Sequence, residues 1–331
     1  MSRPAFRPVT VLDVVAETPD ACSIVLDEDL DYRPGQFLTF RVPHDRLGSV
    51  SRCYSLSSSP QTDDHPAVTV KRVPGGHASN WICDNIRPGS TVEILGPAGS
   101  FTPATLTDDL LLFAGGSGIT PVMSIIRAVL FEGTGNVCLV YANRDPESVI
   151  FDAELAELVR LQPLRVRVVH WLDSQRGYPT TEALAPLVAD CAGRHAFVCG
   201  PEPFMAVAEK VLAGLGTPAE KVHIERFTVD DEESAGSGRV TSVEVELDGT
   251  VHSLRWPDTK RLLDVFIDAG LNPPYSCRQG NCGACMLRLL EGEVELAHNE
   301  ILEEEDFAEN WTLACQAMPR CDRARFTYDA P

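Results

Sequence analysis

The pattern of hydrophobic and polar residues changes twice along this chain of 331 residues. From about Pro8 to Thr105, short apolar runs are broken repeatedly by Pro, Gly and Asp; the runs are VTVLDVV, CSIVL, QFLTFRV, AVTVKRV and TVEILG. This spacing is typical of an antiparallel β-barrel. Between Asp108 and Phe227, apolar strands alternate with helical stretches; the strands are LLLFAGG, VCLVYAN, RVRVVHW, HAFVCGP and KVHIERF. That alternation predicts a parallel sheet with helices on both faces.

The third pattern belongs to the C-terminal part of the chain. The charged stretch VDDEESAGSG has no apolar periodicity and is the best linker candidate. Beyond it, VTSVEVELDGTVHSLRW predicts a hairpin that turns at Asp248-Gly249, and the helical LLDVFIDAG, a cysteine-rich loop and the acidic EEEDFAEN follow. We therefore predict a barrel over residues 1–106, an α/β domain over 107–228, a linker over 229–238 and an α+β domain over 239–331.

Charge and cysteine content narrow the class of protein. The formal net charge of -20 disfavours nucleic acid and anionic membranes as partners, and it allows a basic protein partner to be attracted. The N-terminal MSRPAFRPVT lacks the apolar run of a secretory signal, and no stretch approaches the roughly 18 apolar residues of a membrane span, so we expect a cytoplasmic protein. An odd number of cysteines, eleven, favours a metal site in a reducing compartment over a disulfide framework.

Four of the cysteines have the spacing of an iron–sulfur site. Cys277, Cys282 and Cys285 stand in CRQGNCGACML, and Cys315 follows in TLACQA, which gives Cys-x4-Cys-x2-Cys with a distant fourth. A tight loop can supply three thiolates while a separate strand or turn supplies the last, and this spacing matches plant-type [2Fe-2S] ferredoxins. Zinc is the alternative, but zinc sites favour paired Cys-x2-Cys knuckles that this stretch lacks. We predict these four side chains as the cluster ligands, with the loop glycines allowing close folding around the sulfurs.

Two turns of the α/β region are candidates for nucleotide binding. The run LLLFAGGSGITPVMSIIR places Gly116 and Thr120 between a strand and a helix, where a pyrophosphate would lie on backbone N–H groups. It is not the GxGxxG of Rossmann dehydrogenases and is a weak signal alone. A second strand ends in CGPEPFM, at the carboxyl edge where ligands bind in open α/β sheets. We therefore expect Cys199 and Gly200 beside the nicotinamide; the alternative for Cys199 is a buried core residue.

The barrel region contains residues suited to a flavin. In RCYSLSSSP, Arg52 offers a fork of donors for a phosphate, Tyr54 an aromatic face for an isoalloxazine ring, and Ser55 a hydroxyl for a ring nitrogen. These residues could equally be ordinary strand surface. The later GGHASN could support phosphate binding at a following helix.

Together these motifs resemble the oxygenase reductases of the ferredoxin-NADP reductase superfamily. RCYSL, GGHAS, GGSGITP, CGPEPFM and the four cysteines occur in that family's order, and the resemblance covers essentially the whole chain. It implies a flavin-binding antiparallel barrel, a nicotinamide domain and a plant-type ferredoxin domain, with FAD, NADH and a [2Fe-2S] cluster; FMN is the alternative to FAD. VKRVPGGHASNWICD, YANRDPESVIF, HWLDSQRG and LACQA are similar to reductase components of 3-ketosteroid 9α-hydroxylases, which implies a Rieske-type non-haem iron oxygenase as electron acceptor.

The resemblance also assigns roles to individual residues. Arg52, Tyr54 and Ser55 would hold the flavin, and Gly76 and Ser79 its phosphates.

Three further positions follow from the same resemblance. Lys71, in VKRV, is an expected cofactor-binding residue, and Phe227, in HIERF, would lie near the flavin face unless it is a core residue. Where NADPH-using relatives carry a Ser-Arg pair for the 2′-phosphate, this chain has Leu-Asp. The carboxylate of Asp173 can accept a hydrogen bond from a ribose hydroxyl but repels a phosphate, which predicts NADH as donor. Arg144 and Arg176 are close enough in sequence to reach such a phosphate.

Several alternatives remain for the function. The reductase of phenylacetyl-CoA epoxidase shares this domain order, and the acceptor could belong to another aromatic-ring or P450 monooxygenase system. A nonenzymatic electron carrier or redox sensor is a rival from another class. We predict no catalytic acid–base residue, because the protein supplies geometry and tuning while the cofactors carry the chemistry.

Overall fold

The computed structural model describes residues 6–45, 48–227 and 238–329. By their contacts these residues form two compact units. One unit comprises Pro8–Leu38 and Tyr54–Phe227, and the other joins Thr39–Cys53 to the C-terminal part of the chain. The predicted linker over 229–238 lies, except for its last residue, outside the described residues.

The N-terminal region forms a six-stranded sheet with the order β4-β3-β6-β1-β2-β5. Its strands are β1 (Arg7–Thr18), β2 (Ala21–Asp27), β3 (Phe37–His44), β4 (Gly48–Ser55), β5 (Ala67–Lys71) and β6 (Thr91–Ala98), and helix α1 (His77–Asn85) follows β5. β2 pairs antiparallel with both β1 and β5. An isolated bridge joins Leu56, just after β4, to Val68 in β5, so the two edge strands of the sheet approach each other. The predicted curled antiparallel sheet is confirmed.

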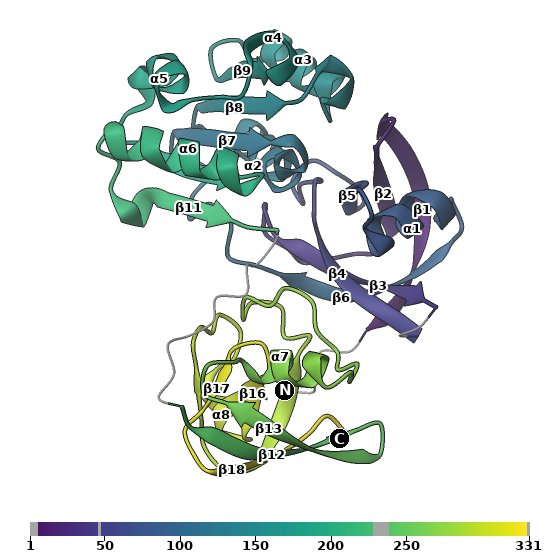
Figure 1. The fold of residues 1–331 in the computed structure, drawn as a ribbon. Helices are drawn as coiled ribbons and strands as arrows, with labels where there is room; N and C mark the ends of the chain where they lie inside the picture. The colour runs from purple at the N-terminus through teal and green to yellow at the C-terminus, as the bar shows by residue number, and fades with distance from the viewer. Residues whose placement is uncertain (1–5, 46–47, 228–237, 330–331) are drawn as a thin grey trace. The chain divides into compact units, whose positions relative to one another are not determined.

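The middle region is a five-stranded parallel sheet with the order β11-β10-β7-β8-β9. It contains β7 (Leu110–Gly115), β8 (Val137–Asn143), β9 (Val166–Leu172), β10 (His195–Cys199) and β11 (Val222–Glu225), close to the five predicted runs. The helices α2 (Ile119–Phe131), α3 (Asp152–Leu161), α4 (Asp173–Arg176), α5 (Thr181–Leu184) and α6 (Glu202–Gly214) lie between the strands in the sequence (Figure 1). Separate apolar cores involve α2 and α3 in one case and α5 and α6 in the other, so helices cover both faces of the sheet.

The C-terminal region combines two sheets and two short helices. The larger sheet has the order β13-β12-β18-β14-β16, and β15 pairs with β17. These elements are β12 (Val240–Leu247), β13 (Thr250–Pro257), α7 (Leu262–Asp268), β14 (Met286–Glu291), β15 (Val294–Leu296), α8 (Glu304–Ala308), β16 (Trp311–Leu313), β17 (Ala317–Pro319) and β18 (Arg323–Thr327). The hairpin turns at Asp248 and Gly249, whose positive φ values of 52° and 71° suit a tight two-residue turn.

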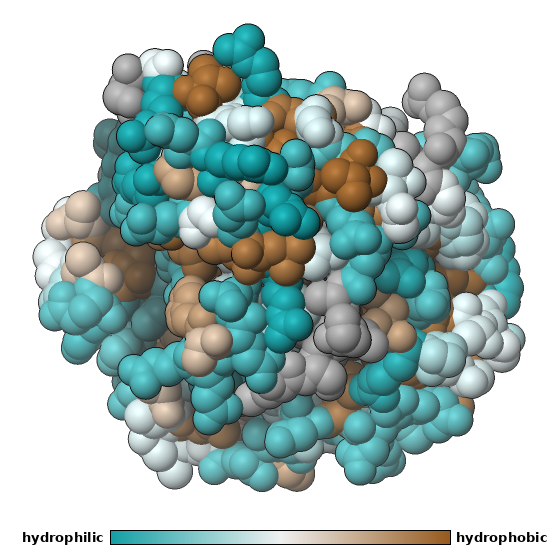
Figure 2. Space-filling view, turned by 90° about the horizontal axis from the view of Figure 1, so that it is seen from below, coloured by the Kyte–Doolittle hydropathy of each residue, from teal (hydrophilic) through white to brown (hydrophobic). Residues whose placement is uncertain are grey.

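The face of the molecule drawn in Figure 2 is largely hydrophilic. Figure 2 shows mostly hydrophilic residues on the face in view, with the hydrophobic residues in small separate groups. No helix in the described part of the chain is both long enough and apolar enough to cross a membrane.

Candidate functional site

The predicted nucleotide motifs meet at the carboxyl edge of the parallel sheet. Cys199, the last residue of β10, is in register with Ala114 of β7 on one side and Glu225 of β11 on the other. The glycine-rich turn follows β7, and Asp173 follows β9. The edge at which ligands bind in open α/β sheets therefore carries both motifs that the sequence singled out.

Close backbone packing explains the glycines of these two turns. A Cβ on Gly118 would collide with the carbonyl oxygen of Cys199, and one on Gly200 would lie 2.9 Å from the backbone nitrogen of Gly115. The buried Thr120 donates its hydroxyl to the carbonyl of Ser117 at 3.0 Å, which closes the turn. Among the described residues, no side chain caps the start of the 3-10 turn η1 (Gly116–Gly118) or of α2, which leaves their first N–H groups suited to an anionic ligand.

A cation from the barrel reaches this glycine turn. Lys71, at the end of β5, places its Nζ 3.3 Å from the position that a Cβ on Gly116 would occupy. Burial lowers the pKa of the Lys71 ammonium, and the nearby Arg144 guanidinium lowers it further. A cationic side chain beside uncapped N–H groups fits the pyrophosphate of a dinucleotide.

A half-buried glutamate with one buried carboxyl oxygen, which no sequence motif marks, lies beside the predicted flavin and nicotinamide residues. Glu225 shares a hydrogen bond with the buried Ser55, and its charge acts on the Cys199 thiol, whose pKa is raised chiefly by burial. Burial raises the pKa of Glu225 from 4.5 to about 8, although the Ser55 hydroxyl opposes the shift. Its Oε2 is buried and has no hydrogen-bond partner in the described structure. An unpartnered buried carboxyl oxygen fits a site completed by a ligand that shares a hydrogen bond with it.

The raised pKa of Glu225 predicts a pH-dependent stability. Between pH 4.5 and 8 the unfolded chain releases this proton while the folded chain keeps it, so the free energy of unfolding falls with rising pH by up to about 1.4 kcal/mol per unit. Glu225→Gln should remove this contribution. Thermal unfolding at pH 5 and pH 8 measures it: the fall in Tm should be smaller in the variant. An equal fall in both proteins would mean that Glu225 ionises normally in the fold.

The predicted flavin-phosphate residues surround the start of α1. Gly76 is the N-cap and bonds no side chain into the first turn. The buried Ser79 accepts a hydrogen bond from the backbone N–H of Val73 at 3.0 Å, which holds the loop before the helix. In the RCYS strand, Tyr54 is half-buried and Arg52 is exposed, with Nη1 donating to the carbonyl of Ser51. The loop leaves the first N–H groups of α1 suited to phosphate oxygens.

Phe227 is exposed, and Asp173 is half-buried at the start of α4. Phe227 is 50% exposed, so it is not a core residue that closes the last strand. Asp173 is half-buried as the first residue of α4; burial raises its pKa, and its buried Oδ1 has no hydrogen-bond partner in the described structure. A ribose hydroxyl could satisfy this oxygen. The two arginines that complicate the donor prediction are engaged, Arg144 with Asp145 at 2.7 Å and Arg176 over the Trp171 ring at 5.3 Å.

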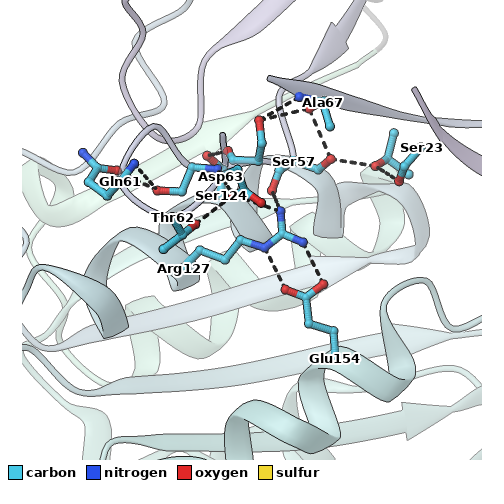
Figure 3. A network of polar contacts seen from close by, with 12 residues as sticks. Ser23, Ser57, Gln61, Thr62, Asp63, Ala67, Ser124, Arg127 and Glu154 are labelled. Atoms are coloured by element: carbon cyan, nitrogen blue, oxygen red, sulfur yellow. Dashed lines mark hydrogen bonds and ion pairs between the residues drawn. The ribbon is translucent and has the colours of Figure 1, made fainter. Parts of the chain in front are cut away.

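A polar network fixes the loop after Ser55 to the helices of the parallel sheet. Arg127 of α2 donates through Nε and Nη2 to both carboxylate oxygens of Glu154 in α3, each at 2.7 Å, and through Nη1 to the carbonyl of Ser57 at 2.7 Å (Figure 3). Ser124, one turn earlier on α2, donates to the carbonyl of Ser58 at 2.5 Å. Since α2 begins at the glycine turn, the network fixes Ser55 relative to that turn.

The four predicted cluster ligands lie in one loop and one strand connection. Cys282, Cys285 and Cys315 are buried and Cys277 is partly exposed. A side-chain hydrogen bond joins Cys277 to Cys282 and raises the pKa of the Cys277 thiol. A second joins Cys285 to Cys315 and raises the pKa of the Cys285 thiol. Gly280 has a φ of 81°, and a Cβ there would lie 2.8 Å from the carbonyl oxygen of His298, so only glycine suits this bend.

Backbone and side-chain donors point at these sulfurs. The N–H of Gln279 lies 3.3 Å from Sγ of Cys277, and Nε2 of Gln316 lies 3.6 Å from Sγ of Cys315. No three His, Cys, Asp or Glu side chains in the described chain form a group that could hold a single metal ion. A [2Fe-2S] cluster needs a different arrangement, because each of its two irons takes two protein ligands. Two adjacent thiol pairs with donors around them fit that group.

Comparisons with known proteins agree with this division of sites. Family models for an oxidoreductase FAD-binding domain, an oxidoreductase NAD-binding domain and a 2Fe-2S iron-sulfur cluster binding domain match residues 23–102, 112–210 and 245–320. The ferredoxin reductase component of 3-ketosteroid-9-alpha-monooxygenase from Mycolicibacterium smegmatis is 49% identical over 339 residues, which cover 96% of each chain. A subunit of the 1,2-phenylacetyl-CoA epoxidase from Escherichia coli is 33% identical over 356 residues, 98% of each chain. The structure of phthalate dioxygenase reductase matches with a TM-score of 0.62 and 25% identity over 98% of each chain.

The chain is therefore an oxidoreductase that combines FAD-binding, NAD-binding and [2Fe-2S] domains. It belongs to the family of oxygenase reductase components that includes the ferredoxin reductases of 3-ketosteroid-9-alpha-monooxygenases. The resemblance, the fold class and the cofactor classes predicted from the sequence motifs are confirmed.

Proposed function

We propose that this protein takes a hydride from NADH and delivers single electrons to a Rieske-type terminal oxygenase that hydroxylates 3-ketosteroids at C9. Support for the acceptor comes from the 49% identity to a reductase of that name across 96% of both chains. The observation that supports the chemistry is the Ser55–Glu225–Cys199 group beside the uncapped glycine turn. We place the functional division at residues 1–106, 107–228 and 239–331, and the site of action in the cytoplasm, where thiols stay reduced for a cluster.

The roles of the residues follow from their chemistry. When bound, FAD accepts the two electrons of a hydride and releases them one at a time to a [2Fe-2S] cluster, which carries single electrons. Tyr54 and Ser55 would hold the flavin ring, Arg52, Gly76 and Ser79 its phosphates, and Lys71 and the Gly116 turn the nicotinamide dinucleotide.

Glu225 and Ser55 would keep water from the edge of the flavin. Their mutual hydrogen bond would fix both side chains so that they orient the flavin ring. Cys277, Cys282, Cys285 and Cys315 would supply the thiolates of the cluster.

Reconstitution with purified oxygenases tests the acceptor. A Rieske 3-ketosteroid hydroxylase with this protein and NADH should convert steroid to the 9α-hydroxylated product, and omission of this protein should abolish conversion. The phenylacetyl-CoA epoxidase oxygenase is the matched alternative, because a component of that system is 33% identical to this chain. Faster turnover with the epoxidase than with the steroid oxygenase would reassign the physiological acceptor and leave the reductase chemistry intact.

Tyr54→Ala should weaken flavin binding. Loss of a stacked aromatic face costs about 1 kcal/mol or more, which corresponds to at least about a fivefold rise in Kd. Tyr54→Phe keeps the ring and serves as the control. Flavin content after gel filtration and the Kd from flavin fluorescence measure the effect. Normal content and Kd in Tyr54→Ala would remove this residue from the flavin site.

Phe227→Ala should change nicotinamide binding without loss of stability. A ring that covers the flavin face must move aside for the nicotinamide, so its removal should lower the KM for NADH by about threefold or more. Phe131, 67% exposed at the end of α2, offers a matched control, and Phe131→Ala should alter neither KM nor Tm. A lower Tm with an unchanged KM in Phe227→Ala would assign Phe227 a structural role.

A further inference from the structure

Two thiols outside the predicted cluster face each other between the N-terminal sheet and helix α1. Cys22 lies in β2 and Cys83 in the last turn of α1, and their Sγ atoms are 3.6 Å apart. Cys22 pairs with Val70 of β5, and the Cys83 thiol lies 3.8 Å from the carbonyl oxygen of Val70, so helix and sheet meet at this point. The sulfur atoms need to approach by only about 1.5 Å to reach disulfide bonding distance.

The surroundings of the two sulfurs differ. Cys22 donates its S–H to the Cys83 sulfur. This hydrogen bond lowers the pKa of the Cys83 thiol and the Arg72 guanidinium lowers it further, whereas burial opposes the shift, as do Asp84 and Asp20. Arg72 is held beside α1 by an ion pair with Asp84 at 2.7 Å. Because Cys22 directs its S–H at the Cys83 sulfur and Arg72 is held at Asp84, the residue after Cys83, the arrangement favours Cys83 as the nucleophile and Cys22 as the resolving thiol.

A second thiol pair provides an internal comparison. Cys138 of β8 and Cys191 also share a hydrogen bond, but both side chains are only 1% exposed. Cys22 and Cys83 are both partly exposed. A small oxidant can therefore reach the barrel pair more easily than the buried pair.

We propose that Cys22 and Cys83 form a peroxide-reactive thiol pair whose oxidation joins β2 to α1 through a disulfide. In the first step the Cys83 sulfur attacks hydrogen peroxide, the O–O bond breaks, and Cys83 sulfenic acid and water form. In the second step the Cys22 sulfur attacks the sulfenic sulfur, the S–S bond forms, and a second water leaves with the thiol proton. Two thiols thus lose two electrons and two protons to one peroxide molecule.

The disulfide has a consequence for the helix that carries the proposed flavin-phosphate residues. Cys83 lies four residues after Ser79, on the same side of α1, so the bond would tie this helix to the sheet. The oxidised protein should then release flavin more slowly. This consequence rests on the proposed role of α1 in flavin binding, whereas formation of the disulfide does not.

Peptide mapping of the full-length holoprotein tests the proposal. The protein is treated with hydrogen peroxide at a dose that preserves cluster absorption, then alkylated and digested without reductant. We expect a disulfide-linked peptide pair containing Cys22 and Cys83, with Cys138 and Cys191 still alkylated. In Cys22→Ser, a 1,3-dione should capture a sulfenic acid at Cys83; in Cys83→Ser, Cys22 should stay a free thiol.

The outcomes separate the two claims. If Cys22 and Cys83 remain alkylated thiols, or if Cys83 is oxidised to sulfinic acid without a linked peptide, the thiol-pair proposal is overturned. Formation of the disulfide with an unchanged rate of flavin release supports the pair and contradicts the proposed placement of flavin phosphates on α1.

Discussion

Cys282→Ser should abolish or strongly alter the visible absorption of the iron–sulfur cluster while NADH still bleaches the flavin. Cys282 is 3% exposed and hydrogen-bonded to Cys277, so a serine there replaces a buried thiolate by a poor iron ligand. Loss of a residue that only orients a metal ligand typically lowers metal affinity or activity by about ten- to a hundredfold. Loss of a ligand itself should therefore lower the rate of electron delivery to an oxygenase by at least about a hundredfold. Anaerobic spectra and oxygenase-coupled turnover measure the two effects separately.

Cys321→Ser is the matched control for this variant. Cys321 belongs to the same C-terminal region, but its sulfur is hydrogen-bonded to backbone groups of Glu293 and Arg323 and does not belong to either thiol pair. Its replacement should leave the cluster spectrum unchanged. Equal loss of flavin reduction and of the cluster in Cys282→Ser would contradict the division of the chain into separately acting cofactor sites.

The parent protein should prefer NADH to NADPH, and Asp173→Arg should reverse or remove the preference. A hydrogen bond to a charged group contributes about 1.5–3 kcal/mol. Because Asp173 would bind the ribose hydroxyl of NADH and repel the 2′-phosphate of NADPH, kcat/KM should be about tenfold to a hundredfold higher with NADH. The buried Oδ1 of Asp173, which has no hydrogen-bond partner among the described residues, is the atom that supports this expectation. Steady-state kinetics with both donors measures the ratio in parent and variant.

Arg144→Ala is the control for the donor prediction. The Arg144 carbonyl accepts a hydrogen bond from the N–H of Ser174 at 2.9 Å, so the Arg144 backbone lies next to the start of α4 and this residue is a rival for a 2′-phosphate. If Arg144 does not bind the 2′-phosphate, its replacement should change kcat/KM for NADH and kcat/KM for NADPH by similar factors. Equal use of both donors by the parent, or an unchanged ratio in Asp173→Arg, would refute the assignment of Asp173.

Local pattern was sufficient for most of the fold. The apolar runs of β7, β8 and β10 formed the centre of the parallel sheet because continuous Val, Leu and Ile are typical of strands buried on both faces, whereas the edge strands β9 and β11 are partly exposed. The Asp-Gly pair identified the hairpin because both residues tolerate positive φ. The cysteine spacing was informative because three ligands lie in one loop.

The missed features depend on contacts between residues distant in sequence. Glu225 stands in the strand run KVHIERF, where a single acidic residue in an apolar strand was the available signal, but its link to Ser55 spans 170 residues of chain. The Arg127 network and the approach of Lys71 to Gly116 also join the barrel to the parallel sheet. Such pairs have no sequence spacing, so only the folded structure reveals them.

An anaerobic reductive titration tests the central claim most directly. The purified protein is titrated with NADH while the absorption of the flavin and of the cluster is followed separately. We predict that both signals bleach and that the chain takes up about three electrons, two on FAD and one on the [2Fe-2S] cluster. Bleaching of the flavin without any change of an intact cluster, or no bleaching of the flavin at all, would contradict electron transfer from NADH through FAD to the cluster.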